Sequence, residues 1–600
     1  MESQDSMSNT ELENDLQTGT PDDASPPEVP SRAPPPVSQA WKIPLIAGIA
    51  IVVALLCGVC LVGTILWTTG VLSIPARKQA APQLMPAAMA FFASVNVDVE
   101  DTAGYKHLTE VYDDVPEVED AWDDFLGQMK KEFDVSYKDD IKPWLGPELA
   151  MGITNMDDVL NGEDPVAVIA AGTRDTKASD AFLDKMLAYL VNEGYDVNDE
   201  TYQKVDYYVV ESENEPDKPL VLGTVKKFVI LTMDKGAMED VIDAAKNKSD
   251  SLADNERYTE VMGTLPRDAA AYMFCDMEDL RAGLSGLQKE HGTTELELPR
   301  QTTEQFEAVQ AAGSALRLDR EGVQLDFAAT FDPDALSPEM LESFYIRASA
   351  NRILKRIPGD VVGFLSGQNL AAVWKSALAS LAKVPGVKEQ LGDLGIQLNL
   401  DSDEGLLDWL PGEFAIALIE ARAIEGLAEA PIGGFAVFEV DDRQEAESTL
   451  QNIIGLLEAL GHLEFDTEEI GDVEMQVVTD PDSEEIVLGV GFIDKHLIIG
   501  FTQDALEAAA DDDFDSIAGD DTFKKVQKHL PSKVGGYLYV NVKAALGLAY
   551  KNMSKQEQEE FDASARPFLE PITALGLAAL PTNPRKGISK GTLFLYIPGE

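Results

Sequence analysis

The stretch "LPRDAAAYMFCD", residues 265–276, decides the fold because three other stretches of the chain share its pattern. They are "MPAAMAFFASVN" from Met85, "IPGDVVGFLSGQ" from Ile357 and "LPSKVGGYLYVN" from Leu530. Each has an aliphatic residue or Met, then Pro, then mostly small or polar residues, then an aromatic in an apolar run. Proline fixes φ and favours an extended predecessor, and the aromatic run is typical of a strand. The pattern therefore predicts four strands, each beginning shortly after a proline.

Other features of the chain also recur at a nearly constant separation. The stretch "WLGPELAMGI" at Trp144 corresponds to "WLPGEFAIAL" at Trp409, 265 residues later. Likewise "PVAVIAAGTRDTKASDAFLDKML" from Pro165 corresponds to "PIGGFAVFEVDDRQEAESTLQNI" from Pro431. Internal repeats are strong evidence about architecture, because each copy specifies one structural unit. The sequence therefore indicates a duplicated unit.

We predict two tandem modules, residues 85–356 and 357–600. "VAVIAAGTRDTKASDAFLDKMLAYLVNEG" is typical of a strand, a turn and an amphipathic helix, and "VDYYVVESENEPDKPLVLGTVKKFVILTM" of three short strands. This mixture predicts an α+β fold class, with a largely antiparallel sheet in each module and helices packed on one face.

The N-terminal region has a different composition. Residues 1–40 are polar, acidic and rich in Pro and Ser, which predicts a disordered tail. From Ile43 to Trp67 run 25 residues without a charge, long enough as a helix to cross a bilayer core of about 30 Å. We therefore predict a single transmembrane helix over 43–67 and a linker over 68–84. One early anchor before a long C-terminal region favours a cell-membrane protein with a cytoplasmic tail and extracytoplasmic modules.

The charge of the chain restricts its partners. It carries 106 acidic and 47 basic residues, a net charge of −59. That balance argues against nucleic acid, whose phosphates require Lys and Arg surfaces. A solvated acidic surface is the simplest interpretation, with cation binding or adaptation to high salt as alternatives. Of the three cysteines, Cys57 and Cys60 lie in the apolar segment, so Cys275 has no partner for a disulfide in the rest of the chain.

Three features of the chain point to a known family: the proline-led strand starts, the segment "YKDDIKPWLGPELAMGI" and the single N-terminal anchor. In these features the chain resembles the bacterial family called domain of unknown function 3352. The resemblance covers roughly residues 84–600, and its motifs are structural. The second copy departs from the first, because "SDEGLLDWLPGEFAIAL" lacks the Lys-Asp-Asp run. The resemblance implies a membrane-tethered bacterial protein and supplies no activity, cofactor or catalytic residue.

Cys275, beside Asp276, is the first candidate for reactive chemistry. The corresponding positions of the other three stretches hold Val95, Gly367 and Val540. No histidine recurs nearby to act as a base, so a small buried strand residue is the better interpretation. The position of Asp276 corresponds to Asn96, Gln368 and Asn541. Polar residues there are expected to cap the helix that follows each strand.

Metal ligands are sparse in the sequence. Asn399, Asp401 and Asp403 have the alternate spacing of a calcium loop, so calcium is the one cofactor considered. The loop lacks glycine at its sixth position, and Leu410 stands where a bidentate Glu belongs. The acidic run "DDDFDSIAGDD", residues 511–521, is denser but irregular, and a solvated loop explains it. The five histidines lack zinc-site spacing, and "SLAK" at 380–383 lacks the companion motifs of penicillin-interacting enzymes.

The absence of an acid, base and nucleophile constellation favours a non-catalytic role over an enzyme. The leading hypothesis is a membrane-anchored protein that binds or scaffolds at the cell envelope, with the bilayer contacted through 43–67 and an unidentified envelope protein or small ligand as its partner. One alternative is an envelope hydrolase that uses carboxylates such as Glu148 and Glu413, which follow Trp144 and Trp409. The other is a carrier of an apolar ligand held between the sheet and its helices, which an exposed apolar groove would favour.

Overall fold

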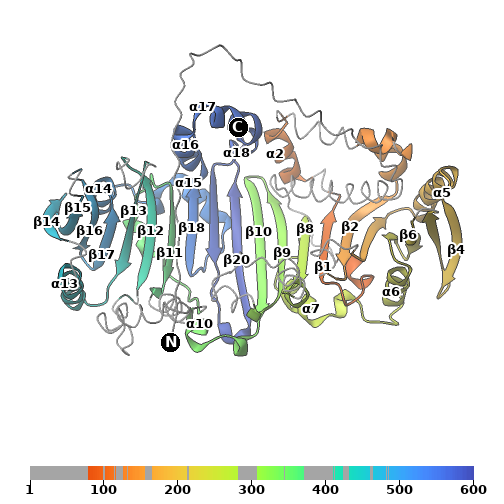
Figure 1. Cartoon of the computed structure of the whole chain (residues 1–600), viewed down its shortest axis with the longest axis horizontal. Coiled ribbons are helices and arrows are strands. Elements are labelled where there is room, and N and C mark those ends of the chain that lie inside the picture. The colour runs from red at the N-terminus through yellow and green to blue at the C-terminus, as the bar shows by residue number, and fades with distance from the viewer. Residues whose placement is uncertain are drawn as a thin grey trace, which may run out of the picture.

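One antiparallel sheet of twenty strands runs through the whole described part of the chain (Figure 1). The structure is a computed structural model. It describes residues 79–98, 102–113, 115, 126–131, 133–155, 165–212, 215–281, 307–343, 345–370, 410, 412–422, 431–459, 464–480, 483, 485–511 and 513–599.

The strands fall into two sets of ten along the chain. The first set is β1 (Phe91–Asn96), β2 (Leu145–Ile153), β3 (Ala167–Thr173), β4 (Asp196–Tyr202), β5 (Val205–Ser212), β6 (Glu215–Val225), β7 (Phe228–Thr232), β8 (Ala271–Asp276), β9 (Val309–Asp319) and β10 (Gly322–Phe331). The second set is β11 (Gly363–Gln368), β12 (Glu413–Glu420), β13 (Ile432–Glu439), β14 (Asp466–Ile470), β15 (Val473–Thr479), β16 (Ile486–Ile493), β17 (His496–Phe501), β18 (Gly536–Asn541), β19 (Ala574–Ala579) and β20 (Ile588–Tyr596).

The spatial order of the strands has the same pattern from either edge. It runs β4, β5, β6, β7, β3, β2, β1, β8, β9, β10 and then β20, β19, β18, β11, β12, β13, β17, β16, β15, β14. Each strand of the first set thus has a counterpart at the mirrored position of the second. The two sets meet at β10 and β20, in the middle of the sheet (Figure 1).

The four proline-led stretches all form strands, as predicted. β1, β8, β11 and β18 each begin six residues after the Met, Leu or Ile that opens the stretch. β1 pairs with β8, and β11 pairs with β18, so related stretches lie side by side. The prolines after Met85 and Ile357 make equivalent bridges, Pro86 to Ser251 and Pro358 to Ser516. The proline therefore fixes how the chain enters the sheet, and the aromatic residue supplies the core.

The prediction of two tandem modules is wrong. β10 and β20 pair from Gly322 with Tyr596 to Thr330 with Ile588, so the sheet crosses the predicted boundary without interruption. The physical reason is that β10 and β20 would each be the edge strand of a separate module. An unpaired edge leaves a row of backbone donors and acceptors open to aggregation. Joining the two edges satisfies those groups, and it makes one sheet from both copies.

Helices lie on both faces of the sheet, which corrects the predicted single covered face. The α-helices are α2 (Ala103–Val111), α5 (Thr176–Asn192), α6 (Lys235–Ala245), α7 (Glu256–Met262), α10 (Pro338–Ser343), α13 (Arg443–Ala459), α14 (Gln503–Ala510), α15 (Asp521–His529), α16 (Val542–Asn552), α17 (Lys555–Ser564) and α18 (Arg566–Leu569). Neighbouring residues of β13 show the two faces. Phe435 packs in one cluster with Leu506 of α14, and Ala436 packs in another with Ile454 of α13.

Short 3₁₀ or π turns connect many of these elements. They are η1 (Ala81–Gln83), η2 (Tyr137–Ile141), η3 (Leu252–Asp254), η4 (Pro333–Ala335), η5 (Arg352–Arg356), η6 (Ile517–Gly519) and η7 (Pro584–Lys586).

The same aromatic packing appears in the core of each half. Tyr258 of α7 meets Phe274 of β8 edge-on, with ring centroids 5.2 Å apart. Phe523 of α15 meets Tyr539 of β18 in the same way, also at 5.2 Å. Such pairs add about 0.5–1.5 kcal/mol to the burial of their apolar area. The repeat therefore reproduces the contacts between helix and sheet as well as the order of strands.

The outermost strands, β4 and β14, are short and acidic. β4 carries Asp196, Asp199 and Glu200, and β14 carries Asp466, Glu468 and Glu469. Charged side chains on an edge strand disfavour pairing with another chain. Part of the net negative charge of the protein therefore lies where a twenty-stranded sheet is most exposed to aggregation.

Three predicted N-terminal segments lie outside the described residues: the tail 1–40, the transmembrane helix 43–67 and residues 68–78 of the linker. Within the described ranges, no helix combines the length and apolarity needed to cross a membrane.

Candidate functional site

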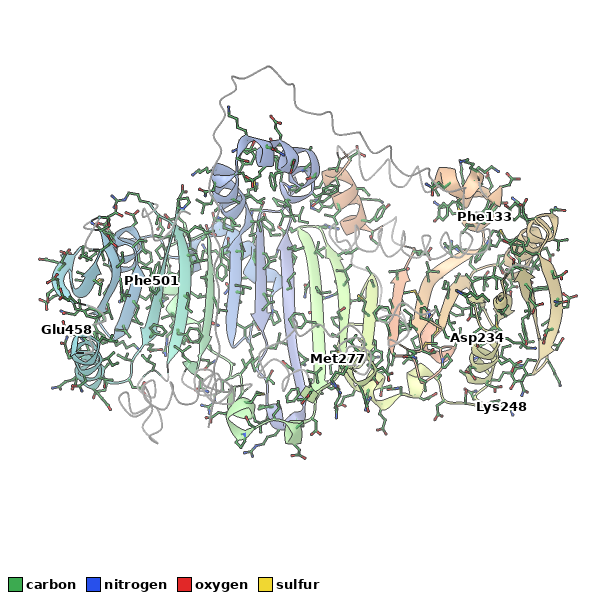
Figure 2. The ribbon with its side chains drawn as sticks, viewed as in Figure 1. Phe133, Asp234, Lys248, Met277, Glu458 and Phe501 are labelled. Atoms are coloured by element: carbon green, nitrogen blue, oxygen red, sulfur yellow. The ribbon has the colours of Figure 1, made fainter. Side chains whose placement is uncertain are left out.

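Six large apolar side chains are exposed together on one face of the second half of the sheet. They are Leu365, Ile416, Leu418, Ile432, Phe501 and Leu538, each between 37% and 56% exposed. They come from five adjacent strands, β18, β11, β12, β13 and β17. We call this surface the open apolar face. Phe501, labelled in Figure 2, is the last residue of β17.

The strand register proves that these side chains share a face. Leu365 lies opposite Ile416 on one side and Leu538 on the other. Gly434 lies opposite both Leu418 and Phe501. Residues directly opposite each other in neighbouring antiparallel strands point to the same side. The six side chains therefore form one contiguous surface.

The opposite side of the same strands is a buried core. Four residues on this buried side are at most 2% exposed, namely Phe364, Ala417, Phe435 and Tyr539. Each of them is next in sequence to a residue of the open apolar face or to Gly434. Because successive side chains of a strand point to opposite faces, these strands are apolar on both sides. Strands of that kind are usually covered on both faces. An exposed second face therefore needs an explanation, and contiguous apolar surface commonly marks a binding site.

Among the residues that the structure describes, the first half of the sheet exposes no comparable surface. The positions that correspond to Leu365, Leu538 and Phe501 hold Ala93, Met273 and Met233, and all three are half-buried. The duplicated core contacts are the same in both halves, but this surface differs. A feature that the repeat does not explain is a better candidate for function than one that it does.

Two ion pairs border the open apolar face at one end. Glu420 follows Leu418 on the same face and lies opposite Ile432, and its Oε1 is 2.5 Å from Nζ of Lys551 on α16. Arg422 makes a bidentate contact with Asp504 at the start of α14, with Nη2 2.7 Å from Oδ1. The Arg422 side chain is 72% exposed and that of Asp504 only 26%, so the cation is the outer member.

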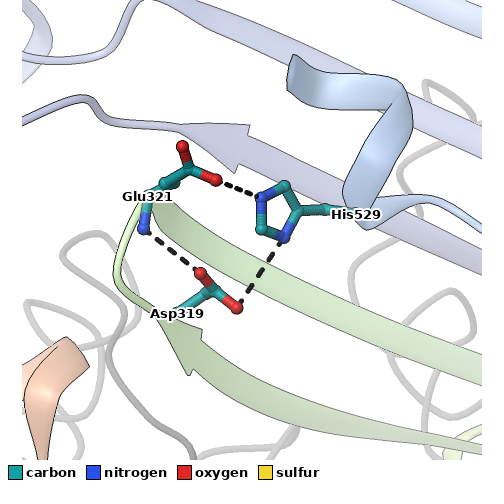
Figure 3. A group of neighbouring side chains, drawn as sticks. All are labelled: Asp319, Glu321 and His529. Atoms are coloured by element: carbon teal, nitrogen blue, oxygen red, sulfur yellow. Dashed lines mark hydrogen bonds and ion pairs between the residues drawn. The ribbon is translucent and has the colours of Figure 1, made fainter. Parts of the chain in front are cut away.

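A second candidate is the group formed by Asp319, Glu321 and His529 (Figure 3). His529 ends α15, Asp319 is the last residue of β9, and Glu321 lies in the turn before β10. Nε2 of His529 is 3.0 Å from Oε2 of Glu321, and Nδ1 is 3.7 Å from Oδ2 of Asp319. The imidazole stacks on Phe594, with centroids 4.1 Å apart and planes 7° from parallel.

This geometry suits an ion-pair network better than a metal centre. The two carboxylates face opposite ring nitrogens, so an ion bound at Nε2 would keep Glu321 and lose Asp319 as a ligand (Figure 3). Nζ of Lys528 also lies 3.0 Å from Oε2 of Glu321, which places a positive charge where a cation would bind. Hydrogen bonds from His529 and then Lys528 hold the pKa of the Glu321 carboxyl below its ordinary value. The group joins the β9–β10 turn to α15 across the centre of the sheet.

Glu148 and Glu413, the carboxylates considered for hydrolase chemistry, have structural partners. Glu148 accepts hydrogen bonds from the backbone N–H groups of Ala80 and Ala81 at 2.8 and 3.1 Å, and burial raises the pKa of its carboxyl. Glu413 accepts one from the N–H of Ile353 at 2.9 Å and another from the hydroxyl of Ser349. Each carboxylate therefore caps a short turn at the equivalent place of its half.

Their separation excludes a shared catalytic site. β2 and β12 are nine strand spacings apart in the sheet, which at about 4.8 Å each is roughly 43 Å. The two carboxyls of a glycosidase lie about 5–9.5 Å apart. Glu148 and Glu413 therefore do not form one carboxylate pair in this fold.

Cys275 and Asp276 have the environments of structural residues. Burial raises the pKa of the Cys275 thiol to about 11, which leaves little of the reactive thiolate at neutral pH. Asp276 contacts Arg257 at 2.9 Å and accepts a hydrogen bond from the N–H of Glu278. Asn541, its counterpart, caps α16 through the N–H of Ala544. The expected capping role is confirmed at both positions.

The other sequence candidates contribute little. The calcium candidates Asn399, Asp401 and Asp403 lie outside the described residues, as does "SLAK" at 380–383. In the acidic run, Asp520 caps α15 through the N–H of Phe523 at 2.7 Å. A cavity of about 940 Å³ lies between α13, α14 and β15–β16. Its lining includes the carboxylates Glu447, Asp472, Glu474, Asp494, Glu507 and Asp511 and the cation Arg443.

Sequence inspection missed the open apolar face. Its signal was present in runs such as "EFAIALIE" and "GYLYVN", where apolar residues occupy consecutive positions instead of alternate ones. Such runs predict strands that are apolar on both faces. They do not predict which face the helices leave open, because that depends on where distant segments pack.

Comparison with known proteins identifies one protein family. The family model described as "Protein of unknown function (DUF3352)" matches residues 47–597. No match is found among curated proteins. Among solved structures, crystal form IV of TP0453 is similar at 9% identity, with 43% of this chain and 81% of that chain covered and a TM-score of 0.23. Crystal form III of TP0453 gives 9% identity, 46% and 92% coverage and the same TM-score of 0.23. A TM-score of that size does not establish a shared fold.

Proposed function

The chain belongs to the protein family of unknown function DUF3352, and from that premise we propose that it is a membrane-anchored, non-catalytic binding protein whose binding surface is the open apolar face. The observation that carries the proposal is the contiguous exposure of six large apolar side chains on five adjacent strands. A soluble surface rarely leaves such a patch uncovered without a binding role.

The membrane location is a separate part of the proposal. The support for it is the uncharged run of 25 residues from Ile43 to Trp67. We propose that this run anchors the chain in the cell membrane, with the tail 1–40 in the cytoplasm and the sheet outside. Reporter fusions at both ends of the full chain, together with protease treatment of intact cells, test this topology. A C-terminal region protected from protease in intact cells would contradict it.

The binding role is tested with an apolar fluorescent dye such as ANS, which reports exposed apolar surface. The full chain is compared with Leu365→Gln and Phe501→Gln, which remove apolar area from the face without touching the buried core. We expect each variant to bind less dye than the wild type. The control is Val191→Gln on α5, because Val191 is 54% exposed and lies outside the face. Equal dye binding by all four proteins would refute the proposed surface.

A further inference from the structure

We propose that the open apolar face binds an acyl chain of an anionic membrane phospholipid, whose phosphate group meets Arg422 and Lys551 at the rim. The inference rests on the proposed function, because it names the ligand class of the same surface. Three properties support it, namely the size of the face, its lack of polar side chains and the cations at one end.

The size of the face suits one acyl chain. Its five strands, from β18 to β17, cover four strand spacings, which at about 4.8 Å each is roughly 19 Å. One leaflet of a bilayer core is about 15 Å thick, half of the ~30 Å core, which sets the length of a lipid tail. A tail lying across the strands from Leu538 towards Phe501 would therefore stay in contact with apolar side chains along its length.

The composition of the face favours a lipid tail over a peptide. Between Leu538 and Phe501 the residues that point to this side are Leu365, Ile416, Leu418 and Gly434, and none of them has a hydrogen-bonding side chain. A peptide laid on such a surface would leave its backbone polar groups without partners, which is costly. An acyl chain has no polar groups to satisfy, so the surface matches it better.

The rim supplies charge complementarity to an anionic headgroup. Lys551 contacts Glu420 at the end of the face, where Glu420 lies opposite Ile432. Arg422 follows β12 at the same end of the strands and binds Asp504 of α14, whose next residues Ala505 and Leu506 pack on the buried side of the sheet. The planar guanidinium of Arg presents a fork of donors that fits phosphate oxygens, and Lys adds a point charge. Although each cation already has a carboxylate partner, Arg422 is largely exposed and can contact a phosphate on its outer side.

The difference between the two halves of the sheet predicts how many lipid molecules one chain binds. Its corresponding positions hold smaller or half-buried side chains such as Ala93 and Met233. The duplicated fold therefore has one such lipid site and not two, and binding is expected to saturate at one phospholipid per chain.

The test places a fluorescent reporter in the middle of the face of the full chain. Cys57→Ser and Cys60→Ser remove the thiols of the apolar segment, and Cys275→Ser removes the half-buried thiol of β8. Leu365→Cys then carries an environment-sensitive fluorophore. The protein is placed in nanodiscs of phosphatidylcholine, alone or with increasing phosphatidylglycerol. The control reporter is Val191→Cys on α5, outside the face.

We expect phosphatidylglycerol to shift the emission of the reporter at position 365 to the blue and to leave the reporter at position 191 unchanged. The double variant Arg422→Gln and Lys551→Gln should need about tenfold more phosphatidylglycerol for the same shift, the change expected for the loss of about 1.4 kcal/mol. Circular dichroism of each variant checks that the sheet is intact.

Two outcomes would overturn the inference. Emission that is already blue in phosphatidylcholine and unchanged by phosphatidylglycerol means that a protein segment, a second copy or any lipid covers the face. Emission that stays red in both means that no lipid tail reaches it. Either result leaves the proposed function standing if dye binding still depends on Leu365 and Phe501, whereas loss of that dependence would remove the binding surface itself.

Discussion

Thr592 of β20 donates a hydrogen bond to Asp326 of β10 at 2.8 Å, and the two residues face each other across the middle of the sheet. They are also counterparts of each other, 266 residues apart, close to the separation of the repeat. Asp326 in turn forms an ion pair with Arg317 of β9 at 2.7 Å. A polar network therefore lies at the join between the two copies.

Replacing Asp326 should weaken that join. Asp326→Ala leaves the partly buried Arg317 without its carboxylate, and Arg317 is 30% exposed. We expect a loss of about 2–3 kcal/mol in the free energy of unfolding, somewhat less than the ~3–5 kcal/mol of a fully buried pair. Thr592→Val removes one hydrogen bond and should cost about 1 kcal/mol. Urea titration of both variants and the double variant measures these losses; if Asp326→Ala matched the wild type, the network would have no role in the join.

The acid stability of the protein should depend on Glu321. Its pKa is held below the ordinary 4.5 by His529 and then Lys528, so the folded state favours the charged carboxylate. A depressed folded-state pKa contributes stability that is complete above the unfolded-state pKa and is lost as the pH falls through the folded-state value. We therefore expect Glu321→Gln to melt below the wild type at pH 6 and to approach it below about pH 4. Melting temperatures across this range give the answer, and a difference that stays constant with pH would contradict the assignment.

The acidic edge strands should protect against aggregation. Glu468→Gln and Glu469→Gln remove two charges from β14, the last strand of the sheet. We expect this double variant to aggregate faster than the wild type, because an uncharged edge can pair with the edge of another molecule. Glu559→Gln and Glu560→Gln on α17 remove the same charge away from any strand and serve as the control. Light scattering of both variants should separate an edge effect from a loss of net charge, and equal rates would favour the latter.

Much of the sheet was predictable from the sequence, because its local signals are strong. The prolines after Met85, Leu265, Ile357 and Leu530 place four strands, and the repeat explains why the order of elements is the same in both halves. The join of β10 to β20 was not predictable. It depends on which edge strands meet in the folded sheet, and no local pattern around residues 322–331 records its partner.

The candidate sites also include some features that the sequence predicted and others that it did not. The helix-capping roles of Asp276 and Asn541 follow from their place after a strand, so the sequence predicted them correctly. The contact of His529 with Glu321 joins residues 208 positions apart and has no counterpart in the repeat, so no pattern indicated it. The open apolar face was signalled by apolar runs but not located, because the exposure of Leu418 depends on what distant segments leave uncovered.

Gly322, the first residue of β10, should be the glycine at which a side chain is least tolerated. Its φ is +144°, and a Cβ at this position would lie 1.9 Å from the backbone oxygen of Leu595 on β20. Gly322→Ala therefore adds a backbone clash at the join to the strain of a positive φ, and we expect a loss well above 1 kcal/mol.

Gly194 separates these two effects, because its φ is +91° and a Cβ there would meet no atom within 4 Å. Gly194→Ala has the strain without the clash, so it should cost about 1 kcal/mol. The difference between the two variants in urea titration measures how tightly β10 and β20 are held together. If Gly322→Ala cost no more than Gly194→Ala, the strands could separate at this end without loss, and the join would be weaker than the nine paired residues from Gly322 to Thr330 imply.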